Sequence, residues 1–219
     1  DVVKPVLYKD IFNNIHGARL NMDLLEPKGS GFVGRHGKDF LLSNDRWSQI
    51  LNLRYGPDGA AWIIDWYDRQ QCHTGRAGDH DRSNGRIFKV QYQNPSPPNV
   101  DLRKLPAHEL VKLMLHKNDW YVRHARKVLQ ERQAADAVPG LVELLAHPDA
   151  TRVLRALWAL HGLGAVTPEL ALKLSAHENP YVRGWTFQLA SEDRNAPDAL
   201  VDRMAELALK DPSPVVRLY

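Results

Sequence analysis

The chain has 219 residues, of which 43% are hydrophobic and 25% are charged, and its formal net charge is +3. This balance is typical of a folded globular protein and excludes a disordered chain. The charge divides evenly, since residues 1–95 hold 13 basic and 11 acidic side chains and residues 96–219 hold 16 and 15. A nucleic-acid surface needs clustered excess charge, so we expect no nucleic-acid partner.

The sequence also predicts no membrane span, because no run approaches the roughly 20 apolar residues that cross a bilayer. The opening residues lack the apolar core of a signal peptide. Cys72 is the only cysteine, so an internal disulfide is impossible and the Cys-x-x-Cys-His attachment motif for haem does not occur.

Residues 1–52 are predicted to be mostly extended. Residues 19–24 alternate strictly between polar and apolar, which places Arg19, Asn21 and Asp23 on one face of a strand. Such a polar face is consistent either with a solvated sheet edge or with a face that meets a ligand.

The stretch around which the first half is organised begins with a turn at residues 56–59, Gly-Pro-Asp-Gly. Residues 61–67 are rich in β-formers and predict a strand, in which Asp65 and Tyr67 point to the same face. A polar loop follows, and a second strand is expected at 87–92. Turn, strand, long loop and strand are typical of one edge of a β-propeller blade.

A proline-rich stretch, NPSPPNVDLRKLP at 94–106, can continue neither a sheet ladder nor a helix. We therefore place a sheet domain at 1–95, a linker at 96–106 and a helical domain at 107–219. Beyond the linker the spacing of apolar residues changes from two to about 3.6, which predicts helices of about 10–15 residues joined by short loops.

A motif ending in Val-Arg recurs in the helical domain, where Arg123 and Arg183 are 60 residues apart and Arg217 lies 34 residues further on. Arg152 falls near the midpoint of the first interval. A repeat of two helices in 29 to 34 residues predicts a helical solenoid. The acid or Asn before the motif suits a helix N-cap, and we expect each Arg to reach an acid of an adjacent repeat. Packing between repeats is expected of three tryptophans near the second helices: Trp120, Trp158 and Trp185.

This pattern resembles the short bacterial type of HEAT repeat over about residues 105–219, with Asp-x-x-x-Val-Arg at the second helix. The last copy stops at Tyr219, a few residues into its helix and without the polar capping repeat of a solenoid end. We therefore expect the last repeat to be truncated and the chain to be a fragment.

The first half resembles the C-terminal blades of membrane-bound dehydrogenase-type proteins of planctomycetes and verrucomicrobia. These are large haem-binding proteins whose propeller is similar to that of glucose/sorbosone dehydrogenases. The motifs that carry the resemblance are Ile15-His16-Gly17-x-Arg19-x-Asn21-x-Asp23, Gly29-Ser30-Gly31-Phe32-Val33-Gly34-Arg35-His36, Gly56-Pro57-Asp58-Gly59, Asp65-Trp66-Tyr67 and His80-Asp81-Arg82 through Gly85-Arg86-Ile87.

The resemblance implies an exported or periplasmic redox protein that oxidises sugars or alcohols. It also implies pyrroloquinoline quinone and calcium as cofactors of the full-length protein, with haem c on a domain absent here. The predicted strands are too few to close a ring of four or more blades, so we expect partial blades and activity only within a longer chain.

The resemblance further implies a site at the mouth of a propeller channel. There a His would remove a hydroxyl proton as hydride leaves, and an Arg would stabilise the resulting negative charge. The catalytic candidates are His73, His80, Arg19 and Asp65. The cofactor-binding candidates are His16, Tyr67 and Arg82.

The loop after the first strand offers two metal hypotheses and one structural alternative. Asp79, Asp81 and Ser83 alternate like the first ligands of a calcium loop. Alternatively, the side chains of this Asp/Asn/Gly loop satisfy its own backbone. Zinc is a further option, through Cys72 with His73 and His80 as nitrogen ligands.

The sequence thus predicts an α+β protein in two parts, with partial antiparallel propeller blades followed by an all-α HEAT-repeat solenoid. Two functions remain open. The first is a fragment of a sugar or alcohol dehydrogenase. The second is a non-catalytic scaffold module, whose concave helical face docks a protein partner or the propeller of its own parent.

Overall fold

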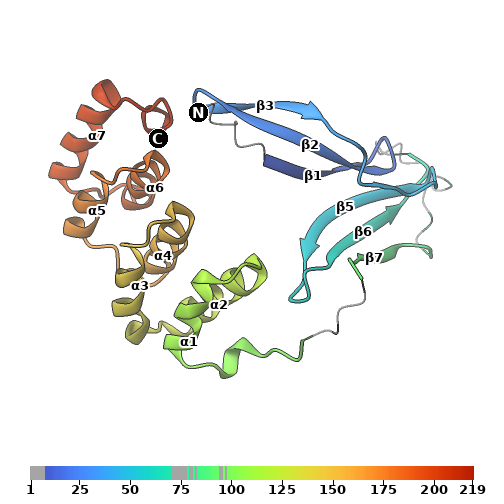
Figure 1. Cartoon of the computed structure of the whole chain (residues 1–219), viewed down its shortest axis with the longest axis horizontal. Coiled ribbons are helices and arrows are strands. Elements are labelled where there is room, and N and C mark those ends of the chain that lie inside the picture. Colours follow the sequence, from blue (N-terminus) through green and yellow to red (C-terminus); the bar gives the residue numbers. More distant parts are fainter. Residues whose placement is uncertain (1–7, 71–77, 79–80, 82, 94–95, 97) are drawn as a thin grey trace, which may run out of the picture. The chain divides into compact units, whose positions relative to one another are not determined.

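In a computed structural model the chain divides into two compact units, Asp1–Pro98 and Asn99–Tyr219 (Figure 1). The structure describes residues 8–70, 78, 81, 83–93, 96 and 98–219. The first unit consists of antiparallel strands and the second of helices, so the expected α+β fold in two parts is confirmed. The division falls within the proline-rich stretch, and residues 99–106 belong to the helical unit, where Leu102 is buried.

The first sheet contains β1 (Tyr8–Asn14), β2 (Arg19–Lys28), β3 (Gly31–His36) and the short β4 (Leu41–Leu42). Its strand order is β1-β2-β3, with β4 also paired to β2, and all pairs are antiparallel. The alternation at residues 19–24 predicts β2 correctly, because Leu20 is buried while Arg19 and Asn21 both bind Asp39 on the other face.

The second sheet contains β5 (Ser48–Tyr55), β6 (Ala61–Tyr67) and β7 (Arg86–Val90), in that order and antiparallel. The strand expected at 61–67 is confirmed with these bounds. The predicted turn at 56–59 joins β5 to β6, and the Gly56 amide donates to the Ala60 carbonyl at 2.9 Å. Gly59 has φ +79°, a conformation that glycine adopts without steric cost.

The core of the sheet unit is small and joins the two sheets. Leu20 of β2, Ile50 of β5 and Ile63 of β6 are its buried residues. Partly buried side chains pack around them: Leu41, Leu53, Phe88 and Val90. One face of each sheet therefore meets the other sheet through this cluster.

The helical unit consists of short paired helices. Its elements are η2 (Leu102–Lys104), α1 (Ala107–Lys112), η3 (Leu113–Leu115), α2 (Asp119–Arg132), η4 (Ala135–Ala137), α3 (Val138–Leu144), α4 (Ala150–Gly162), α5 (Pro168–Leu174), α6 (Pro180–Ala190), α7 (Asp198–Lys210) and η5 (Val216–Leu218). Figure 1 shows α1, α3, α5 and α7 in one row and α2, α4 and α6 in a second row. A continuous apolar core runs between the rows and includes Leu110, Leu129, Leu141, Leu157 and Val182. Each pair therefore buries its apolar stripe against its neighbours.

The second-row helices begin with a recurring cap. The side chains of Asn118, Asp149 and Asn179 each accept a hydrogen bond from the backbone N–H two residues later, at 2.8 to 3.0 Å. This confirms the N-caps predicted at Asp149 and Asn179, whereas α2 is capped by Asn118 and the Asp119 of its motif is the first helical residue. The His two residues before each cap accepts from the cap residue's own N–H through Nδ1, at 3.0 Å: His116, His147 and His177. This role of the histidines was not predicted from the sequence, although all three share the spacing His-x-Asn/Asp.

The repeat arginines differ in what they bind. Arg183 pairs with Asp211 of the next helix pair, its Nη2 lying 2.7 Å from Oδ1, as expected. Arg152 instead lies 3.6 Å from Asp149 at the start of its own helix. The buried Arg of α4 is Arg155, which reaches Asp119 of the preceding pair at 3.0 Å. Arg155 lies almost one turn further along the helix, where the side chain turns inward.

Arg217 and Arg123 complete the series. Arg217 donates to the backbone carbonyl of Asp211. Arg123 is exposed, and no ion pair joins it to any residue that the structure describes. The expectation of an acid on an adjacent repeat is therefore wrong for Arg123 and Arg152. Arg123 is exposed. The side chain of Arg152 is only 20% exposed, and it reaches the preceding helix pair by donating from Nη1 to the backbone carbonyl of His116 at 3.3 Å.

In the described part of the chain, no helix has both the length and the apolar character that crossing a membrane requires.

Candidate functional site

Asp65, a catalytic candidate, lies near the end of β6 with its side chain fully buried. Its Oδ1 accepts hydrogen bonds from the Ser48 hydroxyl at 3.0 Å and the Gln49 amide at 2.8 Å. Its Oδ2 accepts from Arg86 Nε at 2.9 Å and Nη2 at 2.6 Å. Both oxygens are fully engaged, so this carboxylate holds β5, β6 and β7 together and has no free lone pair with which to take a substrate proton.

Tyr67 and Asp45 extend this network. Arg86 Nη2 lies 3.1 Å from Asp45 Oδ2, and the guanidinium lies 4.6 Å from the centre of the Tyr67 ring. Burial and the adjacent Asp45 carboxylate raise the pKa of the Tyr67 phenol. Burial opposes ionisation of Asp45, but hydrogen bonds from the Trp47 amide and Arg86 outweigh it and lower the pKa of Asp45. At neutral pH, Tyr67 is therefore protonated and Asp45 is ionised.

Arg19 belongs to a separate network on the polar face of β2. Its Nη1 lies 2.9 Å from Asp39 Oδ2, and Asn21 donates to the other oxygen of Asp39 at 2.7 Å. The Nε of Arg19 is buried and has no hydrogen-bond partner among the described residues. Further along the same strand, Asp23 Oδ1 lies 2.9 Å from His36 Nδ1.

The structure therefore places the described site candidates in two networks rather than one. Arg19 is neutralised by Asp39 in the first sheet, and Asp65 and Tyr67 surround Arg86 in the second. His16 is exposed in the turn between β1 and β2. The remaining candidates lie outside the described residues: Cys72, His73, Asp79, His80 and Arg82.

The two described members of the calcium hypothesis bind each other. Asp81 Oδ1 accepts from the Ser83 backbone N–H at 3.0 Å and from the Ser83 hydroxyl at 2.6 Å. This agrees with the structural alternative, in which the side chains of the loop bind the loop's own backbone. Among the described residues no group of three or more His, Cys, Asp or Glu side chains is placed to hold a metal ion. The described donor set therefore does not fit calcium.

The outer face of the second sheet carries an exposed apolar stripe, and Arg54 of β5 and Lys89 of β7 lie opposite Trp62 at one end of it. Along β6 the exposed fractions are 41% for Trp62, 46% for Ile64 and 54% for Trp66. Ile87 of β7 pairs directly with Ile64 and is 71% exposed. The sequence carried this signal as apolar residues at both phases of the strand, whereas a strand with one solvated face alternates with polar residues.

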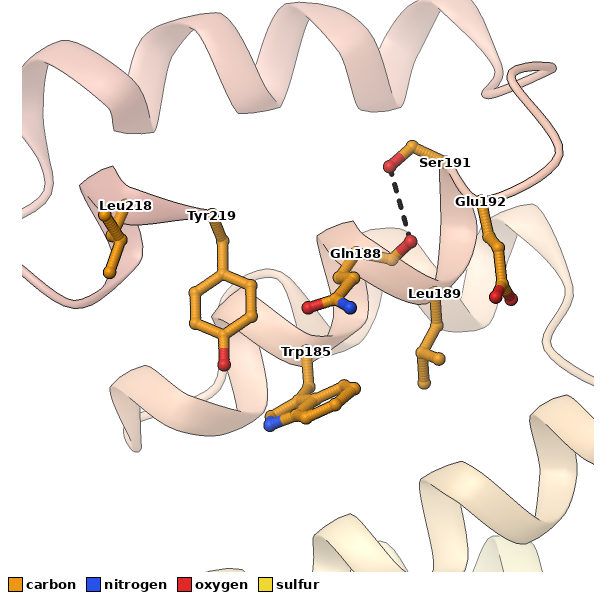
Figure 2. Close-up of a pocket in the computed structure, with 7 residues that line it drawn as sticks. All are labelled: Trp185, Gln188, Leu189, Ser191, Glu192, Leu218 and Tyr219. Atoms are coloured by element: carbon orange, nitrogen blue, oxygen red, sulfur yellow. Dashed lines mark hydrogen bonds between the residues drawn. The ribbon is translucent and has the colours of Figure 1, made fainter. Parts of the chain in front are cut away.

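The helical unit has an open groove beside α6, with a volume of about 590 Å³. Its lining residues are Trp185, Gln188, Leu189, Ser191, Glu192, Leu218 and Tyr219. Figure 2 shows that the side chains of Trp185, Leu189 and Tyr219 project to the same side of the helix. Glu192 ends the groove, and its carboxylate lies 2.6 Å from His161 Nε2.

An aromatic row connects this groove to the neighbouring helices. The ring centres of Trp158 in α4 and Trp185 in α6 are 5.1 Å apart and nearly perpendicular. Tyr219 continues the row at 6.1 Å from Trp185, and Arg126 of α2 lies 5.5 Å above Trp158. Packing between repeats is thus confirmed for Trp158 and Trp185. Trp120 also packs against the core that the helix pairs share, and its ring stacks on His124 of its own helix at 4.0 Å.

In comparison with known proteins, the sheet unit is similar to one family of domains. Residues 15–94 match a family described as "Domain of unknown function (DUF7133)". No curated protein and no solved structure matches the chain.

Proposed function

We propose that the chain is part of an exported dehydrogenase-like redox protein that oxidises sugars or alcohols, with the sheet unit contributing to a propeller. The observation that carries this proposal is that β5–β6–β7 has apolar side chains on both faces, beside the Asp65–Arg86 ion pair of its inner face. Its inner face packs through Ile50 and Ile63, and its outer face presents Trp62, Ile64 and Trp66. In a propeller each sheet lies between two others, so both faces are buried.

The exposed apolar residues of this face form one contiguous patch, which supports the proposal that another part of the protein covers it. A contiguous apolar patch on a soluble monomer marks an interaction surface, whereas single exposed apolar residues are ordinary. Trp62, Ile64 and Trp66 occupy alternate positions of one strand, and Ile87 lies directly opposite Ile64. A further sheet packed at about 10 Å would bury all four side chains.

In this proposed enzyme, the described polar residues hold the sheets together and do not transfer protons. Asp65 holds three strands together and Arg19 is paired with Asp39. In the proposal the base is therefore His73 or His80, which lie outside the described residues. The described residues offer no fitting calcium donor set, so none of them is assigned as a calcium ligand.

The test is dye-linked oxidation of a panel of sugars and alcohols by protein expressed from the complete reading frame, with added pyrroloquinoline quinone and calcium. We expect turnover of at least one substrate, its loss in a His73→Ala, His80→Ala double variant, and its retention in the control His108→Ala. The absence of turnover, or turnover that the double variant retains, would contradict the proposal.

A second candidate function is docking of a protein partner by the helical unit. The observation that favours it is the groove beside α6, where Trp185, Leu189 and Tyr219 line an open surface. Clefts lined by aromatic side chains, with a few polar groups at the rim, are typical of recognition sites.

This second function is tested by co-purification from the native source. A partner is expected to remain bound to the wild type and to a Val142→Ala control, which changes an exposed residue of α3. Trp185→Ala is expected to release it. A partner that all three proteins retain would contradict docking at the groove.

A further inference from the structure

Arg126 is a half-buried cation that forms no ion pair in the described part of the chain. It lies on α2, and its guanidinium is 5.5 Å above the ring of Trp158 on α4. Burial lowers the pKa of this guanidinium, Asp119 partly restores it, and the neighbouring Arg123 lowers it further. No ion pair joins Arg126 to any residue that the structure describes.

Two other arginines of the second-row helices, unlike Arg126, form buried ion pairs. Buried Arg155 pairs with Asp119 at 3.0 Å, and buried Arg183 pairs with Asp211 at 2.7 Å. The acid nearest in sequence on α2, Asp119, is thus already engaged. Because removing a cation from water costs free energy that an anion offsets, Arg126 remains available to pair with an anion of a partner.

The surroundings of Arg126 indicate the chemistry of that anion. Trp158, Trp185 and Tyr219 extend from the guanidinium to the groove beside α6, and they offer apolar and aromatic surface. Glu192 also lines the groove, and its carboxylate lies 2.6 Å from His161 Nε2. A nucleic acid or other polyanion would meet repulsion at Glu192, whereas a peptide with one carboxylate near Arg126 and apolar residues beyond it would not.

We propose that the row formed by Arg126, Trp158, Trp185 and Tyr219 binds an extended peptide segment of a partner protein. A carboxylate of the segment pairs with Arg126, and its apolar side chains pack on the two tryptophans. This inference rests on the docking function proposed above for the helical unit. Arg is suited to this role, since its planar guanidinium binds a carboxylate through two parallel hydrogen bonds while stacking on an aromatic ring.

The experiment uses the intact chain and two short fluorescent peptides, one with a single Glu followed by Leu and Phe residues, the other with that Glu replaced by Gln. Fluorescence anisotropy at low salt gives the two affinities. We expect the Glu peptide to bind roughly tenfold more tightly, as one charge-assisted ion pair provides. This preference is expected to disappear in Arg126→Gln and to persist in Lys127→Gln, which removes the same charge one residue away. Arg126→Lys is expected to retain part of it.

Three results would overturn the carboxylate site: equal binding of the two peptides by the wild type, no binding of the Glu peptide, or tighter binding of a DNA oligonucleotide. Circular dichroism confirms that each variant is folded. Co-purification separates this inference from the docking function. If Arg126→Gln retains a native partner that Trp185→Ala releases, the carboxylate site is refuted while docking stands.

Discussion

At the scale of single residues, the ion pair between Arg183 and Asp211 links two neighbouring helix pairs. Arg183 Nε lies 2.9 Å from Asp211 Oδ2, and both residues are buried. Arg183 Nη1 also donates to the carbonyls of His177 and Glu178, at 2.8 and 2.9 Å. Because the charges satisfy each other away from water, removing either one leaves a buried, uncompensated partner.

We therefore expect Arg183→Met to lower the free energy of unfolding by about 3–5 kcal/mol, the cost of breaking a buried pair. The matched control is Arg123→Met, which changes the same motif position where the side chain is exposed, and it should alter stability by less than about 0.5 kcal/mol. Urea unfolding followed by far-UV circular dichroism measures both. Equal losses in the two variants would show that Arg183 has no special role.

The same pair makes stability depend on pH. Burial raises the pKa of Asp211, but hydrogen bonds from Arg183 and the Ser213 amide outweigh it, so the pKa lies below the ordinary 3.8. A lowered folded pKa contributes stability above pH 3.8, and this contribution is lost as the pH falls through the folded pKa. The stability advantage of the wild type over Asp211→Asn should therefore shrink on acidification below pH 3.8. An advantage that is constant with pH in urea titrations would contradict this assignment.

Residue identity alone could not tell which Arg of a repeat is buried. The Val-Arg motif identifies Arg183 correctly, but in α4 the buried residue is Arg155 rather than Arg152. Small rotations of a helix decide which side chain meets the neighbouring pair, and spacing in the sequence does not record them. The same limit applies to Asp65, because its partner Arg86 is 21 residues away and is identified only by the strand register.

At the scale of elements, β6 carries apolar residues on two unequal faces. Ile63 is 1% exposed and belongs to the core between the sheets, whereas its neighbour Ile64 is 46% exposed on the open face. We expect Ile63→Ala to destabilise the sheet unit by about 2–5 kcal/mol through loss of core packing. Ile64→Ala should cost less than half as much. Hydrogen exchange of β5–β7, measured by mass spectrometry, tests this, and equal acceleration by both variants would argue against an open outer face.

The start of α6 provides a second test at this scale. The Asn179 side chain accepts from the Tyr181 N–H at 3.0 Å, so it caps the helix. Asn179→Ala should lower the free energy of unfolding by about 1 kcal/mol. Asn179→Asp should preserve it, since Asp149 caps α4 in the same way. A destabilisation by Asp equal to that by Ala in urea unfolding would refute the capping role.

Elements with a clear period were predictable and those without one were not. The strand β6 and the helices of the second unit follow from alternation and from 3.6-residue spacing. The strand β3 was missed because every one of its residues is exposed and two of them are glycine, so it has no apolar alternation. The strand β3 forms because its backbone pairs with β2, and the residue pattern of β3 itself does not show this pairing.

At the scale of the whole molecule, the change from strands to helices was predictable because proline breaks both patterns within one short stretch. The arrangement of the candidate site was less predictable from the sequence. Arg19 and Asp65 lie in separate ion-pair networks that depend on the register of two sheets. The open apolar face was visible in the sequence only as strand residues that are apolar at both phases.

The proposed propeller leads to the claim that another sheet covers Trp62 and Trp66 in the working protein. Hydroxyl-radical footprinting with mass spectrometry measures this directly, by comparing the 219-residue chain with the protein purified from its native source. We predict that both tryptophans are readily oxidised in the chain alone and strongly protected in the native protein. Equal oxidation of Trp62 and Trp66 in the two samples would contradict the claim.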